Sequence, residues 1–516
     1  MLSCSKPYAA RSQIACRQLS TSTCARAVDS LNYKYEVQRP GRPSVAPKEY
    51  PDLKSIRANP ALYSKNAEVR NYKRHKTIPQ QLVDQWTRIS EINETLKEPQ
   101  QHIKHLEKQI ARLRYGKTKG HLKDDEGDQE LQHHHQRIQH FKELVEKVQA
   151  EKQELFDSSA TLGLSLPNLT SAQTPLDGQP RVLKYINYDP EVTIKPAEGA
   201  DHTSIGQQLG ILDFASGSTS TGWGFYYLLN EAALLEEALV RYATQVAIKH
   251  GWTRVTPPSL VYSHMADSCG FQPRDANDEQ QIWQIEQPER DAAKPRRSLA
   301  ATAEIPLAAM FADKEIDSKS MPIKYVGTSR CFRAEAGARG IDSKGLYRVH
   351  EFTKVEMFAW ADVPHEEGLN VDETTRYSTQ VFDEIVAIQT EILSSLGLPC
   401  RVLEMPSNDL GASAFRKIDI EAFFPSRIRR DQGWGELTSV SICTDYQSRR
   451  LNTSITKLSR EEPRKYAHTI NGTALAVPRV MACILENNWN SEDKSVTIPE
   501  VLRPYMDGKT KIGGSS

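Results

Sequence analysis

The stretch from Cys331 to Phe358 constrains the fold of this 516-residue chain more than any other. It reads CFRAEAGARGIDSKGLYRVHEFTKVEMF, in which apolar residues recur at nearly alternating positions after a segment with several glycines. The apolar positions that predict a strand are Val349, Phe352, Val355 and Phe358, and the glycines that predict a turn are Gly337, Gly340 and Gly345. We therefore expect two antiparallel strands that are joined by a long basic loop.

The charged residues of this stretch suit two kinds of ligand group. Its cations are Arg333, Arg339, Lys344, Arg348 and Lys354, and its acids are Glu335, Glu351 and Glu356. Guanidinium groups form paired hydrogen bonds with phosphate oxygens, and carboxylates pair with amines, so the pattern suits a triphosphate and an ammonium group. The alternative is an ordinary surface hairpin whose charges pair with one another.

The exact wording of the motifs favours the ligand-binding interpretation. The patterns F-R-x-E-A-G and G-L-x-R-V-H-x-F-x-K-V-E closely resemble the second signature motif of the seryl-tRNA synthetases, a family of class II aminoacyl-tRNA synthetases. Further segments that resemble this family, in its order, are Asp52–Pro60, Gly251–Val261, Thr302–Pro306, Glu436–Arg450, His468–Glu486 and Ile498–Met506. The resemblance covers about residues 52–508.

This resemblance implies an α+β fold, with an antiparallel-sheet class II synthetase catalytic domain and an N-terminal antiparallel helical-hairpin (coiled-coil) arm. The sequence agrees, because it has no parallel βαβ rhythm and no G-x-x-x-x-G-K-[ST] phosphate loop. The implied reaction has two steps: L-serine and ATP give seryl-adenylate and diphosphate, and the serine then moves to the 3′ end of tRNA(Ser). A homodimer is also implied, since Pro258 matches the proline that the family's first motif places at the dimer interface.

Matching the motifs residue by residue implies an ATP site. Arg333 would hold the α-phosphate and the serine carboxylate, and Arg348 and Arg479 would clamp the γ-phosphate. Arg333 and Arg479 are therefore the expected catalytic residues. Glu335 would accept a hydrogen bond from the adenine amino group, and Phe352 would stack on its ring. The other members of this implied site are Ala334, Val349, Glu436, Leu437, Thr438 and Ser439.

The resemblance also implies a metal site and a serine site. Glu436 and Ser439 would bind Mg²⁺, which prefers carboxylate and hydroxyl oxygens and keeps several waters. The residues implied for serine are Thr302, Ala303, Glu304, Arg333, Glu356 and Thr473. A pocket that hydrogen-bonds a hydroxyl rejects alanine, because its polar groups would be left unpaired. The chain departs from the family pattern at Ala474, Pro478 and Ser268–Asp275.

Two heptad series predict the helical hairpin. Their apolar residues are Ile89, Ile92, Leu96, Ile103, Leu106, Ile110 and Leu113, then Leu131, Ile138, Phe141, Val145, Val148 and Leu155. Pro99 fills a missing apolar position and predicts a kink near residues 95–99. The expected tRNA-binding residues, near the tip, are Lys104, Lys108, Arg112, Arg114, Lys117 and Lys119. The alternative is a simply solvated helix face.

The composition of the N-terminus predicts a mitochondrial targeting sequence. Residues 1–28 contain Lys6, Arg11, Arg17 and Arg26, many Ser and Thr, and no acid, which is typical of a transit peptide to the matrix. The mean hydropathy is −0.57, and no apolar run is long enough to predict a membrane span. Eight scattered cysteines without C-x-x-C spacing indicate free thiols.

These observations predict five segments. They are a transit peptide (1–30), an N-terminal segment (31–77), the arm (78–160), the catalytic domain (161–508) and a flexible tail (509–516). Within the catalytic domain, the Gly, Ser and Thr-rich stretch 217–224 predicts a loop or turn. Two rival functions are an inactive synthetase-like binding protein and a ligase that charges a carrier protein. The retained motif arginines argue against the first, and the long arm argues against the second.

Overall fold

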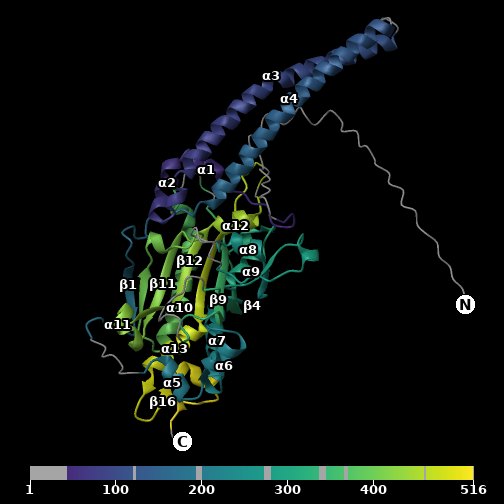
Figure 1. Cartoon of the computed structure of the whole chain (residues 1–516). Helices are drawn as coiled ribbons and strands as arrows, with labels where there is room; N and C mark the ends of the chain where they lie inside the picture. Colours follow the sequence, from purple (N-terminus) through teal and green to yellow (C-terminus); the bar gives the residue numbers. More distant parts are fainter. Residues whose placement is uncertain are drawn as a thin grey trace, which may run out of the picture. The chain divides into compact units, whose positions relative to one another are not determined.

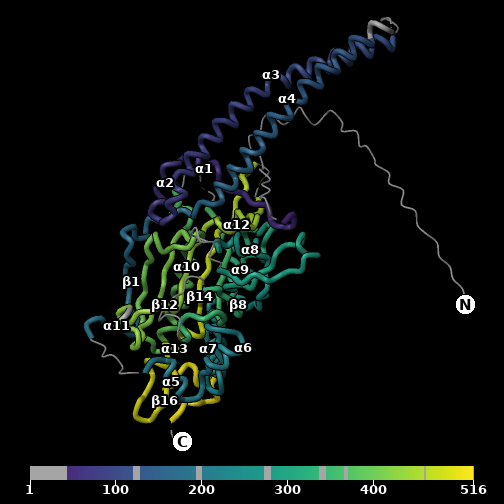
Figure 2. Tube along the Cα trace, viewed as in Figure 1, coloured from purple at the N-terminus to yellow at the C-terminus, as the bar shows by residue number. Residues whose placement is uncertain are grey.

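The centre of the molecule is a sheet of eight strands with helices packed against it (Figures 1 and 2). This computed structural model describes residues 43–119, 124–192, 200–271, 281–335, 345–364, 366, 370–457, 459 and 461–514. The strand order is β1 (Arg181–Ile186), β10 (Cys400–Glu404), β11 (Arg416–Phe423), β12 (Trp434–Thr444), β14 (His468–Ala476), β9 (Glu351–Ala361), β8 (Ile323–Phe332) and β4 (Thr253–Val255). All neighbours are antiparallel except β4 and β8, which confirms the predicted fold class.

The hairpin predicted from the sequence is present as β8 and β9. Side chains alternate between the two faces of a strand, so β9 contributes to two different environments. Val355 and Met357 join the core that helices α7 (Glu231–Lys249), α10 (Arg376–Ser395) and α13 (Val477–Asn487) complete. Phe358 and Trp360 lie on the opposite face, in a second core with residues of α8 (Ser263–Ser268) and α9 (Glu304–Ala309). The polar residues of β9 that matter below share this second face.

Shorter elements complete the described part of the chain. The remaining helices are α1 (Leu53–Ala58), α2 (Pro60–Val69), α5 (His202–Gln208), α6 (Phe214–Ser220), α11 (Ile428–Asp431), α12 (Tyr446–Leu451) and the 3₁₀ turns η1 (Lys73–His75), η2 (Glu289–Asp291), η3 (Ser318–Ser320), η5 (Glu373–Thr375), η6 (Ser407–Asp409), η7 (Pro425–Arg427) and η8 (Glu500–Tyr505). The small sheets pair β2 (Leu212–Asp213) with β3 (Tyr227–Leu228), β5 (Leu260–Tyr262) with β6 (Arg297–Leu299), β7 (Glu315–Ile316) with β13 (Ser454–Ile455), and β15 (Trp489–Asn490) with β16 (Ser495–Thr497) and β17 (Lys511–Gly513).

The prediction of a loop or turn at 217–224 was wrong in its first half. Helix α6 covers part of this stretch, and Asp213 caps it by accepting a hydrogen bond from the backbone N–H of Ser216 at 2.9 Å. The turn begins only after the helix, where Gly222 has a φ of +109°. An upstream capping residue therefore outweighed the weak helix propensity of the stretch.

The arm consists of two long helices that lie side by side, α3 (Ile78–Thr118) and α4 (Asp124–Ser165) (Figure 1). Predicted heptad positions fill the space between them: Leu106, Ile110 and Ile138 are buried together. Helix α3 continues through Pro99, whose ring is buried, so the proline does not end the helix. Helix α4 extends beyond residue 160, the predicted end of the arm.

Buried hydrogen bonds attach the base of the arm to the large sheet. Arg70, which is 1 % exposed, donates to the backbone carbonyls of Asn168 and Ala414, both at 2.8 Å. Arg450 donates to the carbonyl of Leu164, near the end of α4, at 2.7 Å. Backbone carbonyls on both sides of this junction therefore have guanidinium partners, which satisfies groups that burial would otherwise leave costly.

Candidate active site

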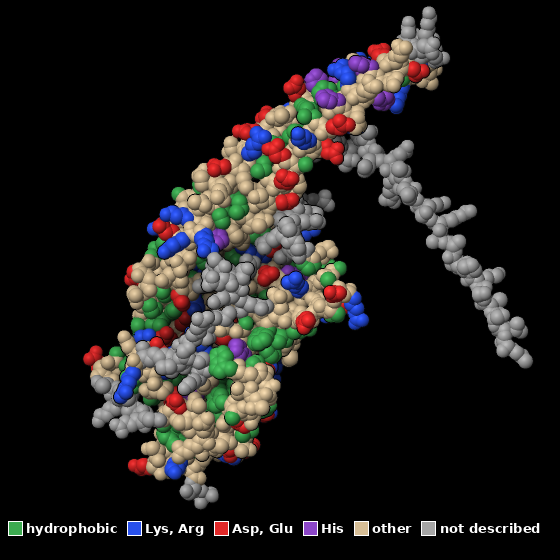
Figure 3. Space-filling model, in the orientation of Figure 1, with side chains coloured by type: hydrophobic (Ala, Val, Ile, Leu, Met, Phe, Trp, Pro, Cys, Tyr) green, Lys and Arg blue, Asp and Glu red, His purple; other side chains and the backbone are tan. Residues whose placement is uncertain are grey.

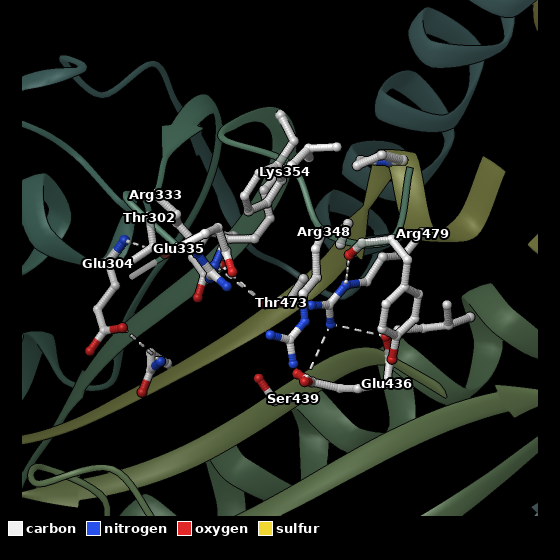
Figure 4. Close-up of a pocket in the computed structure, with 18 of the residues that line it drawn as sticks. Thr302, Glu304, Arg333, Glu335, Arg348, Lys354, Glu436, Ser439, Thr473 and Arg479 are labelled. Carbon is white, nitrogen blue, oxygen red and sulfur yellow. Dashed lines mark hydrogen bonds and ion pairs between the residues drawn. The ribbon is translucent and has the colours of Figure 1, made fainter. Parts of the chain in front are cut away.

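A pocket of about 130 Å³ lies on the second face of β9 (Figure 4). Strands β9, β12 and β14 form its floor, and the segments around α9 and the start of α13 supply its ends. The lining residues are Phe271, Thr302, Glu304, Arg333, Glu335, Tyr347, Arg348, Val349, Phe352, Lys354, Glu356, Glu436, Leu437, Ser439, Asn471, Thr473, Ala476, Pro478 and Arg479. Charged groups of both signs therefore meet in one small cavity.

One end of the pocket is built around the carboxylate of Glu304, the first residue of α9. The side-chain amides of Gln447 and Asn471 donate to its two oxygens at 2.6 and 3.1 Å. Burial, and then the neighbouring Glu356 carboxylate, raise the pKa of Glu304 to about 7. This carboxyl group is thus fixed in position but readily changes protonation near neutral pH.

A second carboxylate, Glu356 on β9, lies close to this end. It forms an ion pair with Lys354, and it accepts a hydrogen bond from the hydroxyl of Thr473 at 3.3 Å. Both members of the ion pair are almost fully buried. Because Lys354 and Glu356 are two residues apart on a strand, they point to the same side. Two carboxylates and the threonines Thr302 and Thr473 therefore line the same pocket, where an ammonium and a hydroxyl group could pair with them.

Arg333 lies between this end and the other, and its backbone is held on both sides. Its N–H donates to the carbonyl of His350 at 2.9 Å, and the Nδ1 atom of His350 lies 2.8 Å from the Arg333 carbonyl. The guanidinium lies 5.2 Å from the ring centre of Phe352. Glu335, two residues after Arg333, has a φ of +46°, which turns the chain away from the direction of the strand.

The other end of the pocket carries positive charge. Arg479, on α13, donates from Nε to the carbonyl of Tyr347 at 3.2 Å and from Nη1 to the carboxylate of Glu436 at 3.3 Å. Burial would raise the pKa of Glu436, but the charges of Arg479, Lys417 and Arg333 hold this pKa well below its usual range. Glu436 is therefore a carboxylate, and Arg348 lies close to it in Figure 4.

Most of the predicted site residues meet in this pocket. Those that line it are Thr302, Glu304, Arg333, Glu335, Arg348, Val349, Phe352, Glu356, Glu436, Leu437, Ser439, Thr473 and Arg479. Ala303, Ala334 and Thr438 were also predicted, but they do not line it. Thr438 pairs with Ile420 of the helix-covered core, whereas Ser439 pairs with Asp419, so alternation turns Thr438 away.

Several lining residues were not assigned to a site by the sequence analysis, although Lys354 was named there among the cations of its stretch. They are Phe271, Tyr347, Lys354, Asn471, Ala476 and Pro478. Strict two-residue alternation would have found Lys354, next to Glu356 on its face of β9, and Asn471, next to Thr473 on β14. Phe271 and Tyr347 come from loops, and only the tertiary structure brings them here.

The predicted tRNA-binding cations lie on α3 of the arm or, for Lys119, directly after it, and not at the pocket. Five are exposed, whereas Lys117 is half-buried and pairs with Asp128 at 2.6 Å. Figure 3 shows basic and acidic side chains interspersed along the arm. A second group of exposed cations at the arm base, Lys54, Lys73 and Arg74, was not predicted, and these have no acidic partner in the described ranges.

Comparisons with known proteins agree with this geometry. The family model for the tRNA synthetase class II core domain (G, H, P, S and T) matches residues 285–488. The chain is 40% identical to the mitochondrial serine–tRNA ligase of Saccharomyces cerevisiae, over 81% of this chain and 88% of that protein. It is 36% identical to the serine–tRNA ligase of Rubrobacter xylanophilus, over 90% of this chain and 99% of that protein.

A protein from an animal and a solved structure are also similar to this chain. The mitochondrial serine–tRNA ligase of Mus musculus is 32% identical over 96% of this chain and 90% of its own. The structure of seryl-tRNA synthetase from Pyrococcus horikoshii complexed with ATP is 29% identical, has a TM-score of 0.71, and matches over 90% of this chain and 100% of that one.

Proposed function

The chain belongs to the seryl-tRNA synthetases of class II, and we propose which of its residues bind serine, ATP and tRNA. The enzyme is a serine–tRNA ligase that depends on ATP. The observation that carries the assignment of sites is the polarity of the pocket. Glu304 and its acidic neighbour Glu356 belong to one end. Figure 4 shows Arg348 and Arg479 at the other end, with Arg333 between them and Glu304.

Serine binds at the carboxylate end. Its ammonium group pairs with Glu304 and Glu356, and the hydroxyls of Thr302 and Thr473 are available to its own hydroxyl. The amides of Gln447 and Asn471 each donate a hydrogen bond to one of the two Glu304 oxygens. The carboxylate therefore keeps its orientation when serine binds. Alanine would leave buried polar groups unpaired, so the site disfavours it.

ATP binds along the basic end, with its α-phosphate at Arg333. A serine carboxylate oxygen attacks the α-phosphorus, the bond to the bridging oxygen breaks, and diphosphate leaves. Arg333 stabilises the charge that develops at phosphorus, and Arg348 and Arg479 hold the γ-phosphate. Phe352 offers its ring to adenine, and Glu335 accepts from the adenine amino group. A hydroxyl of the terminal adenosine of tRNA then attacks the seryl carbonyl, and AMP leaves.

Glu436 and Ser439 are the residues that would hold Mg²⁺. Both line the pocket, and the lowered pKa of Glu436 keeps it in the anionic form that this ion prefers. Within the described ranges, no three His, Cys, Asp or Glu side chains are grouped closely enough to hold a metal ion. Phosphate oxygens and water would therefore complete the shell. The ion would neutralise phosphate charge when bound.

The arm is the proposed binding surface for tRNA(Ser). Its exposed cations suit the phosphate backbone, and double-stranded RNA is recognised mostly through shape and backbone. The cellular site is the mitochondrion, as the names of the yeast and mouse relatives support, and we assign the matrix from the composition of residues 1–28. No helix in the described part of the chain is long and apolar enough to span a membrane.

We also propose that the enzyme works as a homodimer. Strand β6 pairs with β5 on one side, and on the other the N–H of Leu299 donates to Trp283. The exposed apolar residues of this small sheet are Leu260, Tyr262, Trp283 and Ile285. An apolar sheet face next to the first motif suits a second copy of the chain.

The test is ATP–diphosphate exchange by the purified protein. We expect exchange with serine and much less with alanine or threonine. Arg333→Ala should reduce exchange by about 10²- to 10³-fold, the loss typical of one transition-state donor. Arg330→Ala is the matched control, because Arg330 lies on β8 outside the pocket and pairs with Glu351 at 2.9 Å. Exchange that is independent of the amino acid, or equal in the two variants, would contradict these assignments.

A further inference from the structure

A buried hydrogen-bond network beside the pocket joins three segments that are far apart in the chain. His202 begins α5, Glu486 lies near the end of α13, and Leu346 precedes the pocket residues Tyr347 and Arg348. His202 is 8 % exposed and Glu486 is 4 % exposed. Neither side chain lines the pocket, so neither has a part in the reaction described above.

The hydrogen bonds determine which nitrogen of His202 carries the proton. Its Nδ1 lies 2.7 Å from the carboxylate of Glu486, and the backbone N–H of Leu346 donates to its Nε2 at 3.0 Å. An N–H group can only donate, so Nε2 is unprotonated and Nδ1–H donates to Glu486. Glu486 also accepts from the backbone N–H of His202 at 3.2 Å and from the hydroxyl of Ser426 at 2.9 Å. The imidazole is therefore held in one orientation and one tautomer.

The approach of the backbone to this ring requires a glycine. Gly345 has a φ of +78°, and a Cβ atom there would lie 2.3 Å from Nε2 of His202 and 2.7 Å from Oγ1 of Thr203. Both the left-handed backbone and the short distance exclude a side chain. Gly345 thus allows the next residue, Leu346, to bring its N–H to the imidazole.

The network reaches Arg479 through Tyr347, and Arg348 is the next residue in the chain. The carbonyl of Tyr347 accepts from Arg479, and the Tyr347 ring lies 4.7 Å from its guanidinium. Arg348 follows in the chain and lines the pocket. Arg479 and Glu486 are two helical turns apart on α13, which places them on the same side of the helix. His202 therefore connects the helix that carries Arg479 to the segment that carries Arg348.

We propose that His202 is a positioning residue for ATP. Its neutral imidazole ties α13 to the segment 345–348 and keeps Arg348 and Arg479 at the separation that one polyphosphate requires. The inference rests on the proposed ATP site but concerns a residue that touches no substrate. Without the imidazole, the N–H of Leu346 would be a buried donor without an acceptor, and the segment would move to satisfy it.

Two substitutions separate the two hydrogen bonds of the ring. The side-chain amide nitrogen of asparagine can take the position of Nδ1 in histidine. His202→Asn therefore keeps the hydrogen bond to Glu486 and loses the one from Leu346. The side-chain amide oxygen of glutamine can take the position of Nε2 in histidine, so His202→Gln keeps an acceptor for the N–H of Leu346. We expect His202→Asn to raise the KM for ATP in serine-dependent exchange by about 5- to 30-fold, the factor for one unpaired buried donor. The KM for serine should change by less than about twofold.

The expected pattern is an ATP-specific defect in His202→Asn and its rescue in His202→Gln. Gly345→Ala adds a methyl group that would collide with Nε2 of His202 and displace the N–H of Leu346. This variant should also raise the KM for ATP. A purely structural role would lower the Tm of both His202 variants and leave the KM for ATP unchanged, and that result would overturn the proposal. Exchange by the wild type, and its loss in Arg479→Ala, test the ATP site separately, so the two hypotheses fail independently.

Discussion

At the scale of single residues, Glu304 shows how surroundings change the chemistry of a common side chain. The carboxylate is buried, carries an amide donor on each oxygen, and lies near a second acid, Glu356. Burial and like charge both disfavour ionisation, which is why its pKa rises to about 7. A cation that arrives beside it, such as the serine ammonium, would favour its ionised form.

This pKa makes serine binding depend on pH. Only ionised Glu304 pairs with the ammonium, and its ionised fraction increases as pH rises through about 7. The KM for serine in ATP–diphosphate exchange should therefore fall by about tenfold between pH 6 and pH 8. Glu304→Gln should show a high KM with little change across this range. A KM for serine that is equal at the two pH values in the wild type would contradict the assignment.

At the scale of elements, the packing residues of the arm and the exposed cations of α3 lie on different sides of the helix. Apolar residues such as Leu106, Ile110 and Ile138 hold α3 to α4, whereas Lys108 and Arg112 are exposed. Long helices gain most of their stability from such packing rather than from propensity. Charge on the outer side can therefore be changed without loss of the hairpin.

Neutralising Lys108, Arg112 and Arg114 together should raise the KM for tRNA and leave serine-dependent exchange unchanged. The slope of log KM against log salt should decrease by roughly one for each phosphate that the arm no longer neutralises. The matched control neutralises the exposed Lys249, Lys294 and Lys319 on the catalytic body, which removes the same charge elsewhere. Equal effects of the two triple variants would show that only net charge matters, and not the position on the arm.

At the scale of the whole molecule, the proposed sites for adenylate formation and for tRNA binding lie in separate parts of the chain. The lining residues of the pocket fall between Phe271 and Arg479, all beyond the arm. At the base of the arm, Gln85 and Ser158 are hydrogen-bonded at 3.0 Å, so the helices can be cut above this pair and rejoined. The packing of α1 and α2 around the base would then be kept.

Replacing residues 87–156 with a short Gly-Ser linker should keep serine-dependent exchange near the wild-type rate and strongly reduce tRNA charging. The pocket residues remain, but the proposed phosphate-binding cations are removed. Parallel measurement of exchange and of seryl-tRNA formation separates the two half-reactions. Unchanged KM for tRNA would make the arm a structural hairpin, and loss of exchange would show that the arm and the pocket are energetically coupled.

Removing residues 1–30 should keep the protein out of mitochondria. This segment carries the basic, Ser and Thr-rich composition of a transit peptide and lies outside the described residues. Fractionation of cells that express full-length and truncated chains would measure the change, and exchange activity should be equal in the two. Import of the truncated chain at the full-length level would exclude this segment as the address.

The sequence by itself determined the family, the antiparallel class and most of the pocket. It could do so because these features are encoded locally, in contiguous motifs such as Cys331–Phe358 and in apolar periodicity. Alternation along β9 and β14 would even have supplied Lys354 and Asn471. One failure also has a local cause, since the capped helix α6 was taken for a loop.

Only the tertiary structure decided the chemical state of the site. The pKa of Glu304 depends on Gln447 and Glu356, which are distant in sequence, and the tautomer of His202 depends on Glu486, 284 residues away. Burial and electrostatic effects act through space and weaken with distance, so they depend on which segments pack together. No local pattern marks a histidine at the start of a short helix as the proposed link between two arginines of the pocket.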